Sequence, residues 1–191
     1  LDDGDNFYLG TNQGLYVRTR SKSNDFQLIK GTSGQVWDLK KIYGTIFCGH
    51  NKGTFLVKEN KAIRIYEGSG TWEVKRIPGR TDVLLQGNYN GLSTLVKVNG
   101  TWIYGDKIEG FDISSKSFDF TTTNKLVVNH EFKGVYILDI NDKLNLVENL
   151  SVVPRMGYDS SVFNYQDKIK YASNEGIFTI DLVSSQLKKD S

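Results

Sequence analysis

The sequence contains few of several residue types, and each shortage excludes a class of protein. Among its 191 residues are one cysteine, two prolines and two histidines. The single cysteine, Cys48, rules out an internal disulfide, and its apolar neighbours predict a small buried side chain. The two histidines have neither the spacing of a zinc site nor a cysteine pair beside them. We therefore expect no metal site.

Long hydrophobic runs and regions of one charge are also missing. No segment approaches the roughly 18 apolar residues of a membrane-spanning helix. The formal charge is only +2, from 24 Lys and Arg against 22 Asp and Glu, and the longest basic cluster is the pair Lys40-Lys41. We therefore expect no nucleic-acid partner. The first residues resemble no leader peptide, so we expect a mature or excised segment whose membrane contact, if any, lies outside this chain.

Motifs for catalysis or cofactor binding are absent from the sequence. The serines lack a Gly-x-Ser-x-Gly elbow, and the segment Glu67–Thr71 lacks the lysine and the spacing of a phosphate-binding loop. Apolar residues do not recur at helical spacing beyond a turn or two, whereas alternation such as Ala62–Tyr66 is common. We expect an all-β, non-enzymatic protein without a cofactor.

A repeat of about 40 residues is the main signal in the sequence. Five glycines follow a β-rich run and a polar turn, at separations of 39, 38, 43 and 42 residues: Gly14, Gly53, Gly91, Gly134 and Gly176. A type I turn followed by a glycine with positive φ closes a tight hairpin, so a hairpin is predicted at each position.

A second phrase recurs before each following strand: a glycine, then an aromatic residue, then an acid. The pairs are Trp37-Asp38, Trp72-Glu73, Phe111-Asp112 and Tyr158-Asp159. Each pair is predicted to start the innermost strand of its repeat. Because every repeat carries it, a structural role is favoured, with the aromatic packed between repeats and the acid accepting backbone N–H groups. A ring of carboxylates for a ligand or ion is the alternative.

Four short strands in about 40 residues are typical of one blade of a β-propeller, a four-stranded antiparallel sheet. In the second repeat the predicted strands, from innermost to outermost, are 36–43, 46–49, 54–58 and 62–66. We expect one propeller segment over residues 1–191, with repeats at about 1–33, 34–69, 70–109, 110–156 and 157–191. The first repeat lacks an innermost strand, so the chain is expected to form part of a larger propeller.

The segment Asp3–Tyr16 (DGDNFYLGTNQGLY) resembles the signature of regulator-propeller repeats. These repeats occur in extracytoplasmic sensor regions of bacterial two-component and LuxR-type regulators, and their signature reads D-G-N-hydrophobic-W-hydrophobic-G-T-x-x-G-L. Segments 87–92 and 107–115 are similar to versions that precede a triple-tyrosine module. The chain departs from the signature at Tyr8 and Phe47, which replace its tryptophan.

The resemblance implies a ligand-sensing region in the periplasm or another extracytoplasmic space, for glycans or their breakdown products. Its output domain would lie outside this chain, and ligand occupancy would shift a conformational or homodimer equilibrium. Two alternatives stay open: a propeller enzyme acting on glycans, such as a lyase or glycosidase, and a scaffold for protein partners.

Candidate ligand-binding residues follow from loop position. In a propeller, the loops between second and third strands share a face with those between outermost and next innermost strands, and loops commonly carry function. On this face we expect His50, Tyr89, Phe132 and Arg155. Exposed aromatics at Tyr89 and Phe132 could stack on a sugar, although packing on a neighbouring blade is the simpler alternative.

Overall fold

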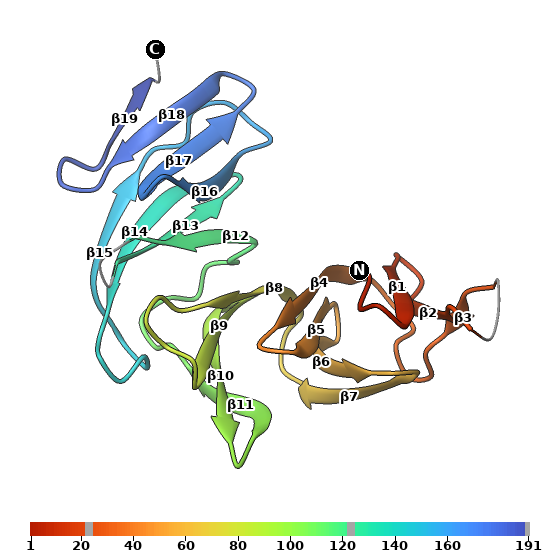
Figure 1. Cartoon of the computed structure of the whole chain (residues 1–191). Helices are drawn as coiled ribbons and strands as arrows, with labels where there is room; N and C mark the ends of the chain where they lie inside the picture. Colours follow the sequence, from red (N-terminus) through yellow and green to blue (C-terminus); the bar gives the residue numbers. More distant parts are fainter. Residues whose placement is uncertain (22–24, 122–124, 190–191) are drawn as a thin grey trace. The chain divides into compact units, whose positions relative to one another are not determined.

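The computed structural model describes residues 1–21, 25–121 and 125–189, and all regular structure in these ranges is β-strand. Within them, no segment forms a helix that could cross a membrane. The strands form five antiparallel sheets, and in each sheet the chain adds neighbouring strands in sequence order (Figure 1). The prediction of an all-β protein with five repeats is confirmed.

The strand bounds are as follows. Sheet 1 contains β1 (Asn6–Gly10), β2 (Leu15–Thr19) and β3 (Gln27–Leu28). Sheet 2 contains β4 (Val36–Ile42), β5 (Thr45–His50), β6 (Gly53–Lys58) and β7 (Lys61–Tyr66). Sheet 3 contains β8 (Thr71–Arg76), β9 (Val83–Asn88), β10 (Gly91–Val98) and β11 (Thr101–Lys107).

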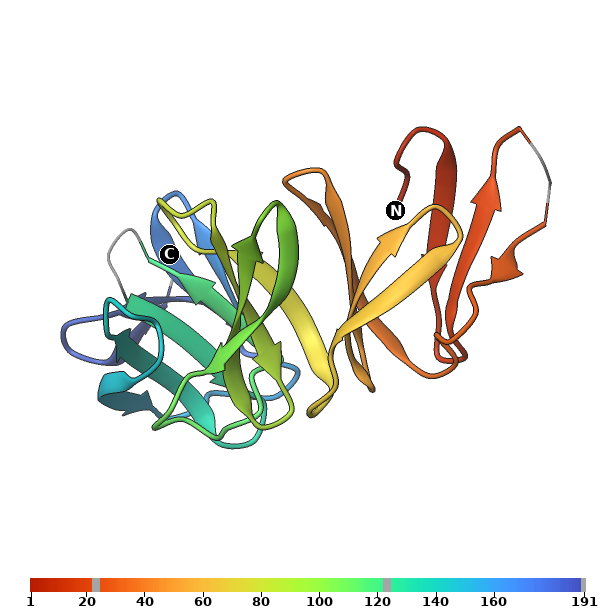
Figure 2. The same cartoon turned by 90° about the horizontal axis from the view of Figure 1, so that it is seen from below.

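The remaining two sheets lie in the C-terminal half of the chain. Sheet 4 contains β12 (Ser117–Phe120), β13 (Lys125–His130), β14 (Gly134–Ile140) and β15 (Val147–Val153). Sheet 5 contains β16 (Ser161–Tyr165), β17 (Lys168–Ser173), β18 (Gly176–Asp181) and β19 (Gln186–Lys189). Figure 2 shows the same sheets from below, where each is a meander of adjacent strands.

Sheet 1 differs from the other four in having three strands within the described residues. Leu1 lies along the edge of β1 that is not paired with β2. The Leu1 amino group donates a hydrogen bond of 2.9 Å to the Tyr8 carbonyl oxygen, and the Tyr8 N–H donates one of 2.8 Å to the Leu1 carbonyl oxygen.

The hydrophobic core lies between neighbouring sheets, and β5 illustrates why. Successive side chains of a strand point to opposite faces. Ile46 and Cys48 pack with Tyr8 and Leu15 of sheet 1, whereas Phe47 packs with Val74 and other residues of sheet 3. A strand covered on both faces needs a continuous apolar run, which is the pattern seen at 46–48. Cys48 is fully buried, as predicted, and burial raises its thiol pKa to about 12.

Four of the anchor glycines begin the third strand of their sheets, and Gly14 lies directly before β2, the second of the three strands of sheet 1. All five have positive φ. Gly53 also has no room for a side chain, because a Cβ there would collide with the carbonyl oxygen of Tyr66 at the end of β7. The sequence predicted the conformational reason for this glycine but not the close approach of the outermost strand.

The chain divides into two compact units, and three strands of sheet 3, β9, β10 and β11, are each divided between them. Unit 1 consists of Leu1–Arg76, Arg80–Gln86 and Leu95–Gly105. Unit 2 consists of Ile77–Gly79, Gly87–Thr94 and Asp106–Ser191.

Candidate functional site

The first strands of sheets 2 and 3 carry a group of alternating charges in unit 1. Lys40 lies 3.4 Å from Asp38 and 2.9 Å from Glu73, and Lys75 lies 3.4 Å from Glu73. Asp38 also accepts the backbone N–H of Val74 at 3.3 Å. These contacts of Asp38 and Glu73 link β4 to β8.

Burial and charge act in opposite directions in this group. Burial raises the pKa of Asp38, although Lys40 and the Val74 N–H work against it. Burial also acts to lower the pKa of Lys40, but the two carboxylates outweigh it and the pKa is raised. Lys40 therefore stays charged at neutral pH, as a half-buried cation between two strands.

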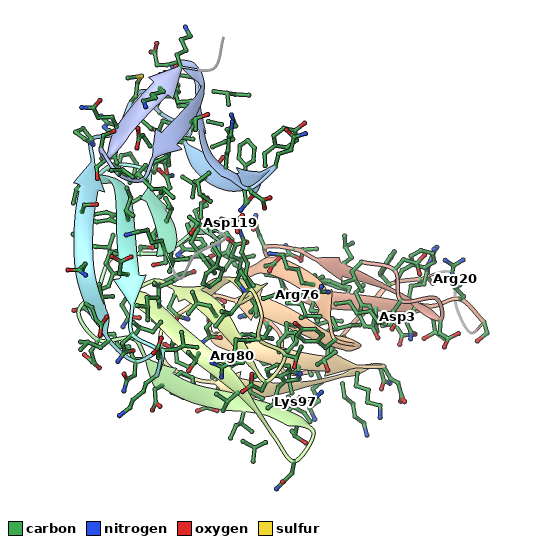
Figure 3. The ribbon with its side chains drawn as sticks, turned by 60° about the vertical axis from the view of Figure 1, so that its left-hand side comes forward. Asp3, Arg20, Arg76, Arg80, Lys97 and Asp119 are labelled. Atoms are coloured by element: carbon green, nitrogen blue, oxygen red, sulfur yellow. The ribbon has the colours of Figure 1, made fainter. Side chains whose placement is uncertain are left out.

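The same inter-sheet bond recurs in unit 2, at a residue that the sequence repeat did not identify. Asp119 of β12 (Figure 3) accepts the backbone N–H of Asn164 of β16 at 3.0 Å, as Asp38 does with Val74. Phe118-Asp119, and not Phe111-Asp112, is therefore the counterpart of Trp37-Asp38. On β16 the position that corresponds to Glu73 of β8 holds Phe163, which has no carboxylate.

The predicted equivalence of the four aromatic–acid pairs is thus wrong for two of them. Phe111-Asp112 and Tyr158-Asp159 lie in the loops before β12 and β16 and do not start these strands. The physical reason is loop length: residues 67–70 suffice before β8, whereas 108–116 and 154–160 precede β12 and β16. A longer loop separates the glycine phrase from the strand that it was expected to begin.

These displaced residues have different environments. Phe111 is buried and packs edge-on against Tyr136, with 5.3 Å between ring centroids, and Asp112 pairs with Lys107. Tyr158 is 59% exposed, so it is not packed between sheets as predicted. Asp159 is also exposed and adopts φ +53°, a left-handed conformation that is uncommon outside glycine.

Trp37 and Trp72 are the pair that fits the prediction of aromatic packing between repeats. Their ring centroids lie 4.9 Å apart, at an interplanar angle of 46°. The β4–β5 register shifts between Val36 and Asp38, so Trp37 occupies a β-bulge, a feature that re-aims a side chain. The bulge leaves Trp37 partly exposed while it contacts Trp72.

His50 was predicted on the binding face, and the structure places it in the interior instead. Its side chain is fully buried. Nδ1 accepts the backbone N–H of Lys52 at 3.0 Å, Nε2 lies 3.2 Å from the Thr32 carbonyl oxygen, and the ring packs edge-on against Phe55. Burial lowers its pKa. A neutral ring with both nitrogens hydrogen-bonded has a structural role, so this prediction is corrected.

The other predicted ligand residues are spread over three loops. Tyr89 lies half-buried at the tip of the β9–β10 hairpin, and Arg155 is exposed after β15. Phe132 lies at the tip of the β13–β14 hairpin and is 72% exposed. His130 supports this tip, because its Nδ1 accepts the backbone N–H of Phe132 at 3.1 Å and that of Lys133 at 3.3 Å.

A pocket of about 340 Å³ lies in unit 2, where the β13–β14 hairpin meets the start of β12 and the loop before β16. It is lined by groups that donate or accept hydrogen bonds: Lys116, Ser117, Asn129, Glu131, Asp159, Ser160 and Ser161. Phe132 and Tyr158 directly follow or precede two of its carboxylates in the chain. The pocket therefore combines one cation, two carboxylates and several neutral polar groups, with exposed aromatic residues next to it in sequence.

Hydrogen bonds fix the walls of this pocket. Asn129 is buried and its Nδ2 donates to the Ser160 carbonyl at 2.9 Å. The Asn174 side chain accepts the Tyr158 N–H at 2.7 Å, and the Asn174 N–H bonds the Tyr158 carbonyl at 3.1 Å. The loop that presents Asp159 is thus tied to sheets 4 and 5 through Ser160 and the Tyr158 backbone.

The sequence identified only part of this pocket. The hairpin with Phe132 was predicted on the binding face, but Asp159 was assigned to a repeated structural pair, and Lys116 and Asn129 were not identified. Asp159 could have been found from its surroundings, because Gly157-Tyr158-Asp159-Ser160 is a run of turn-forming residues directly before a strand. Across the described ranges, no three His, Cys, Asp or Glu side chains group closely enough to bind a metal.

No protein-family model and no curated protein matches the sequence. Among solved structures, the chain is similar to the extracellular domain of the hybrid two-component system BT4673 from B. thetaiotaomicron, with a TM-score of 0.66 and 16% identity. That match covers 92% of this chain and 26% of the other.

Two further structures illustrate how widely this architecture is shared. The WD40 β-propeller domain of Doa1 matches with a TM-score of 0.60 and 12% identity over 94% of this chain and 60% of that one. Dihydro-heme d1 dehydrogenase NirN matches with a TM-score of 0.64 and 12% identity over 97% of this chain and 45% of that one. At such low identity the likeness concerns fold alone, and the fold is that of β-propeller blades.

Proposed function

We propose that this chain is the ligand-sensing region of a bacterial signal-transduction or transcriptional regulator, placed outside the cytoplasm, and that it binds its ligand without transforming it. The observation that carries the proposal is the pocket between β12, the β13–β14 hairpin and the loop before β16, with its fixed polar walls. The fold likeness to an extracellular domain of a two-component system supports it.

The chemistry of the pocket favours a small, hydroxyl-rich ligand such as an oligosaccharide. Glu131 and Asp159 can accept hydrogen bonds from hydroxyl groups, while Lys116 and the serine hydroxyls can donate them. Phe132 offers an exposed ring face beside Glu131. A polar pocket with an aromatic neighbour can orient such a ligand by hydrogen bonds and bury one of its faces.

A signalling role needs the bound state to differ from the free state in a second property. We propose that ligand occupancy shifts a conformational or homodimer equilibrium, since a ligand changes an equilibrium only through different affinities for its two states. The output domain would receive that shift from outside these 191 residues.

A thermal-shift screen against oligosaccharides and peptides tests the proposal. A ligand at 100 times its dissociation constant adds about 2.7 kcal/mol to the free energy of unfolding, which is readily measured. We expect at least one oligosaccharide to stabilise the protein and to remain chemically unchanged after prolonged incubation. Turnover of a stabilising glycan would instead establish the enzyme alternative, and the absence of any stabilising compound would contradict the binding role.

A further inference from the structure

A second cavity, separate from the proposed ligand pocket, lies in unit 1 beside the first strands of sheets 2 and 3. Its volume is about 540 Å³, within the range of roughly 300–1,000 Å³ for small-molecule sites. The walls come from Leu39 to Ile42 of β4 and from Val74 to Arg76 of β8, together with Leu1.

The charged residues that line this cavity are all cations. They are Lys40, Lys41, Lys75 and Arg76. The nearby carboxylates of Asp38 and Glu73 are engaged by Lys40 and Lys75. Four cations against two carboxylates leave a local excess of two positive charges, which attracts anions.

Lys41 and Arg76 account for this excess. Among the ion pairs of the described residues, neither side chain has a carboxylate partner. The guanidinium of Arg76 (Figure 3) lies over the Tyr43 ring, 5.0 Å from its centroid. A cation–π contact of this kind positions the guanidinium while leaving its charge and its N–H donors available.

The remaining wall of the cavity is apolar. Its accessible part comes from Leu1 and Leu39, which are partly buried, whereas Ile42 and Val74 lie beneath it in the core between sheets 2 and 3. A bare inorganic ion would leave this surface uncovered, whereas a ligand with a hydrocarbon part would bury it and gain hydrophobic free energy.

We propose that this cavity binds a small amphipathic anion, a carboxylate or phosphate monoester whose head group pairs with Lys41 and Arg76 and whose apolar body packs on Leu1 and Leu39. Partial burial strengthens such a pair relative to one in bulk water, and added salt weakens it. The site is independent of the hydroxyl-rich ligand proposed for unit 2.

Hexanoate and hexyl phosphate are suitable probes, with hexanol as the neutral analogue and inorganic phosphate as the anion without a tail. Titrations of the whole chain would be followed by amide chemical shifts. We expect both anionic probes to shift the amides of residues 39–42 and 74–76, with affinities that fall as NaCl is added. The anionic probe that binds with the higher affinity identifies the preferred head group.

Two variants and one control variant test whether Lys41 and Arg76 bind the anionic head group. Lys41→Gln and Arg76→Gln should each weaken hexanoate binding by about fivefold or more, because each removes one of the two unpaired cations. Lys61→Gln removes an exposed lysine of β7 and should leave the affinity unchanged. All three side chains are exposed, so we expect the substitutions to leave the melting temperature unchanged. An unchanged melting temperature verifies that each variant is folded.

Three outcomes would overturn the proposal. The first is no response of the 39–42 and 74–76 amides to either anionic probe. The second is binding of hexanol, or of inorganic phosphate, as tight as that of hexanoate. The third is an equal affinity of the wild-type protein and the two glutamine variants for hexanoate.

Discussion

The β5–β6 and β13–β14 hairpins have the same local sequence plan but different environments. Each has a histidine before its tip, His50 or His130, whose Nδ1 accepts a backbone N–H from the turn. His50 also contacts the Thr32 carbonyl oxygen through Nε2 and is fully buried, whereas His130 remains partly accessible beside the exposed Phe132. The same turn thus stabilises the interior in one repeat and presents a surface in another.

This difference teaches that repeat position alone does not assign function. What separates the two hairpins is the connection that covers them: the loop containing Thr32 lies on the first, and a polar pocket lies beside the second. Both are short loops between a second and a third strand, and a sequence repeat treats them alike. Substitutions at matched positions therefore test the comparison directly.

The largest effect is expected at the anchor glycines, where Gly53 and Gly176 differ in available space. Both have φ near +120°, but only at Gly53 would a Cβ collide with backbone, that of Tyr66. We expect Gly53→Ala to lower the free energy of unfolding by about 2–3 kcal/mol more than Gly176→Ala, as measured by urea denaturation. Equal losses would mean that backbone strain, and not the close approach, determines the requirement for glycine.

The next largest difference in the free energy of unfolding is expected between substitutions of the two histidines. His50→Ala removes a buried ring and leaves the Thr32 carbonyl and Lys52 N–H without their partner, which should cost about 2–4 kcal/mol. His130→Ala should cost less than about 1 kcal/mol, because water can replace the ring at the partly exposed tip. Guanidinium denaturation of both variants measures the gap, and similar costs would contradict the assignment of the first hairpin to the interior.

The pH dependence of stability sharpens the same contrast. Burial lowers the pKa of His50 in the folded state, so below the unfolded value of about 6.5 the unfolded chain binds more protons. Stability should therefore be complete above this pH and should decline as the pH falls below about 6.5. His50→Gln should remove more of this decline than His130→Gln, as followed by melting temperature. An unchanged decline in His50→Gln would assign it to other groups.

The smallest stability effect is expected at the exposed hairpin tip. Phe132 is 72% exposed, so Phe132→Ala should change the free energy of unfolding by less than about 0.5 kcal/mol. Chemical denaturation measures this value. A loss above 1 kcal/mol would show that the ring packs on the protein and is not available to a ligand.

Much of the fold could be predicted because its determinants are local. Alternating apolar residues, hairpin glycines and a period near 40 are visible in the sequence, and the predicted order of strands in sheet 2 matches β4 to β7. The main local feature that could not be predicted from the repeat was the length of the loop before each first strand. The glycine phrase before β12 is followed by additional residues, so Asp112 was chosen where Asp119 makes the inter-sheet bond.

The candidate site was predicted less well because it depends on contacts between distant segments. Asp159 and Glu131 are 28 residues apart in the sequence and line one pocket only because β13 and β16 belong to adjoining sheets. His50 failed as a surface candidate because the segment that covers it, at Thr32, precedes it by 18 residues. Neither relation leaves a signal in one sequence, whereas the exposed Phe132 could be expected from its turn.

The account is tested most directly by ligand-induced stabilisation of two tip variants, Phe132→Ala on the β13–β14 hairpin and Lys52→Ala on the β5–β6 hairpin. The measurement is the melting-temperature shift produced by a stabilising oligosaccharide from the screen. We predict that Phe132→Ala loses most of the shift while Lys52→Ala retains the wild-type value. The reverse pattern, or an equal loss in both variants, would contradict the placement of the binding surface on the β13–β14 hairpin.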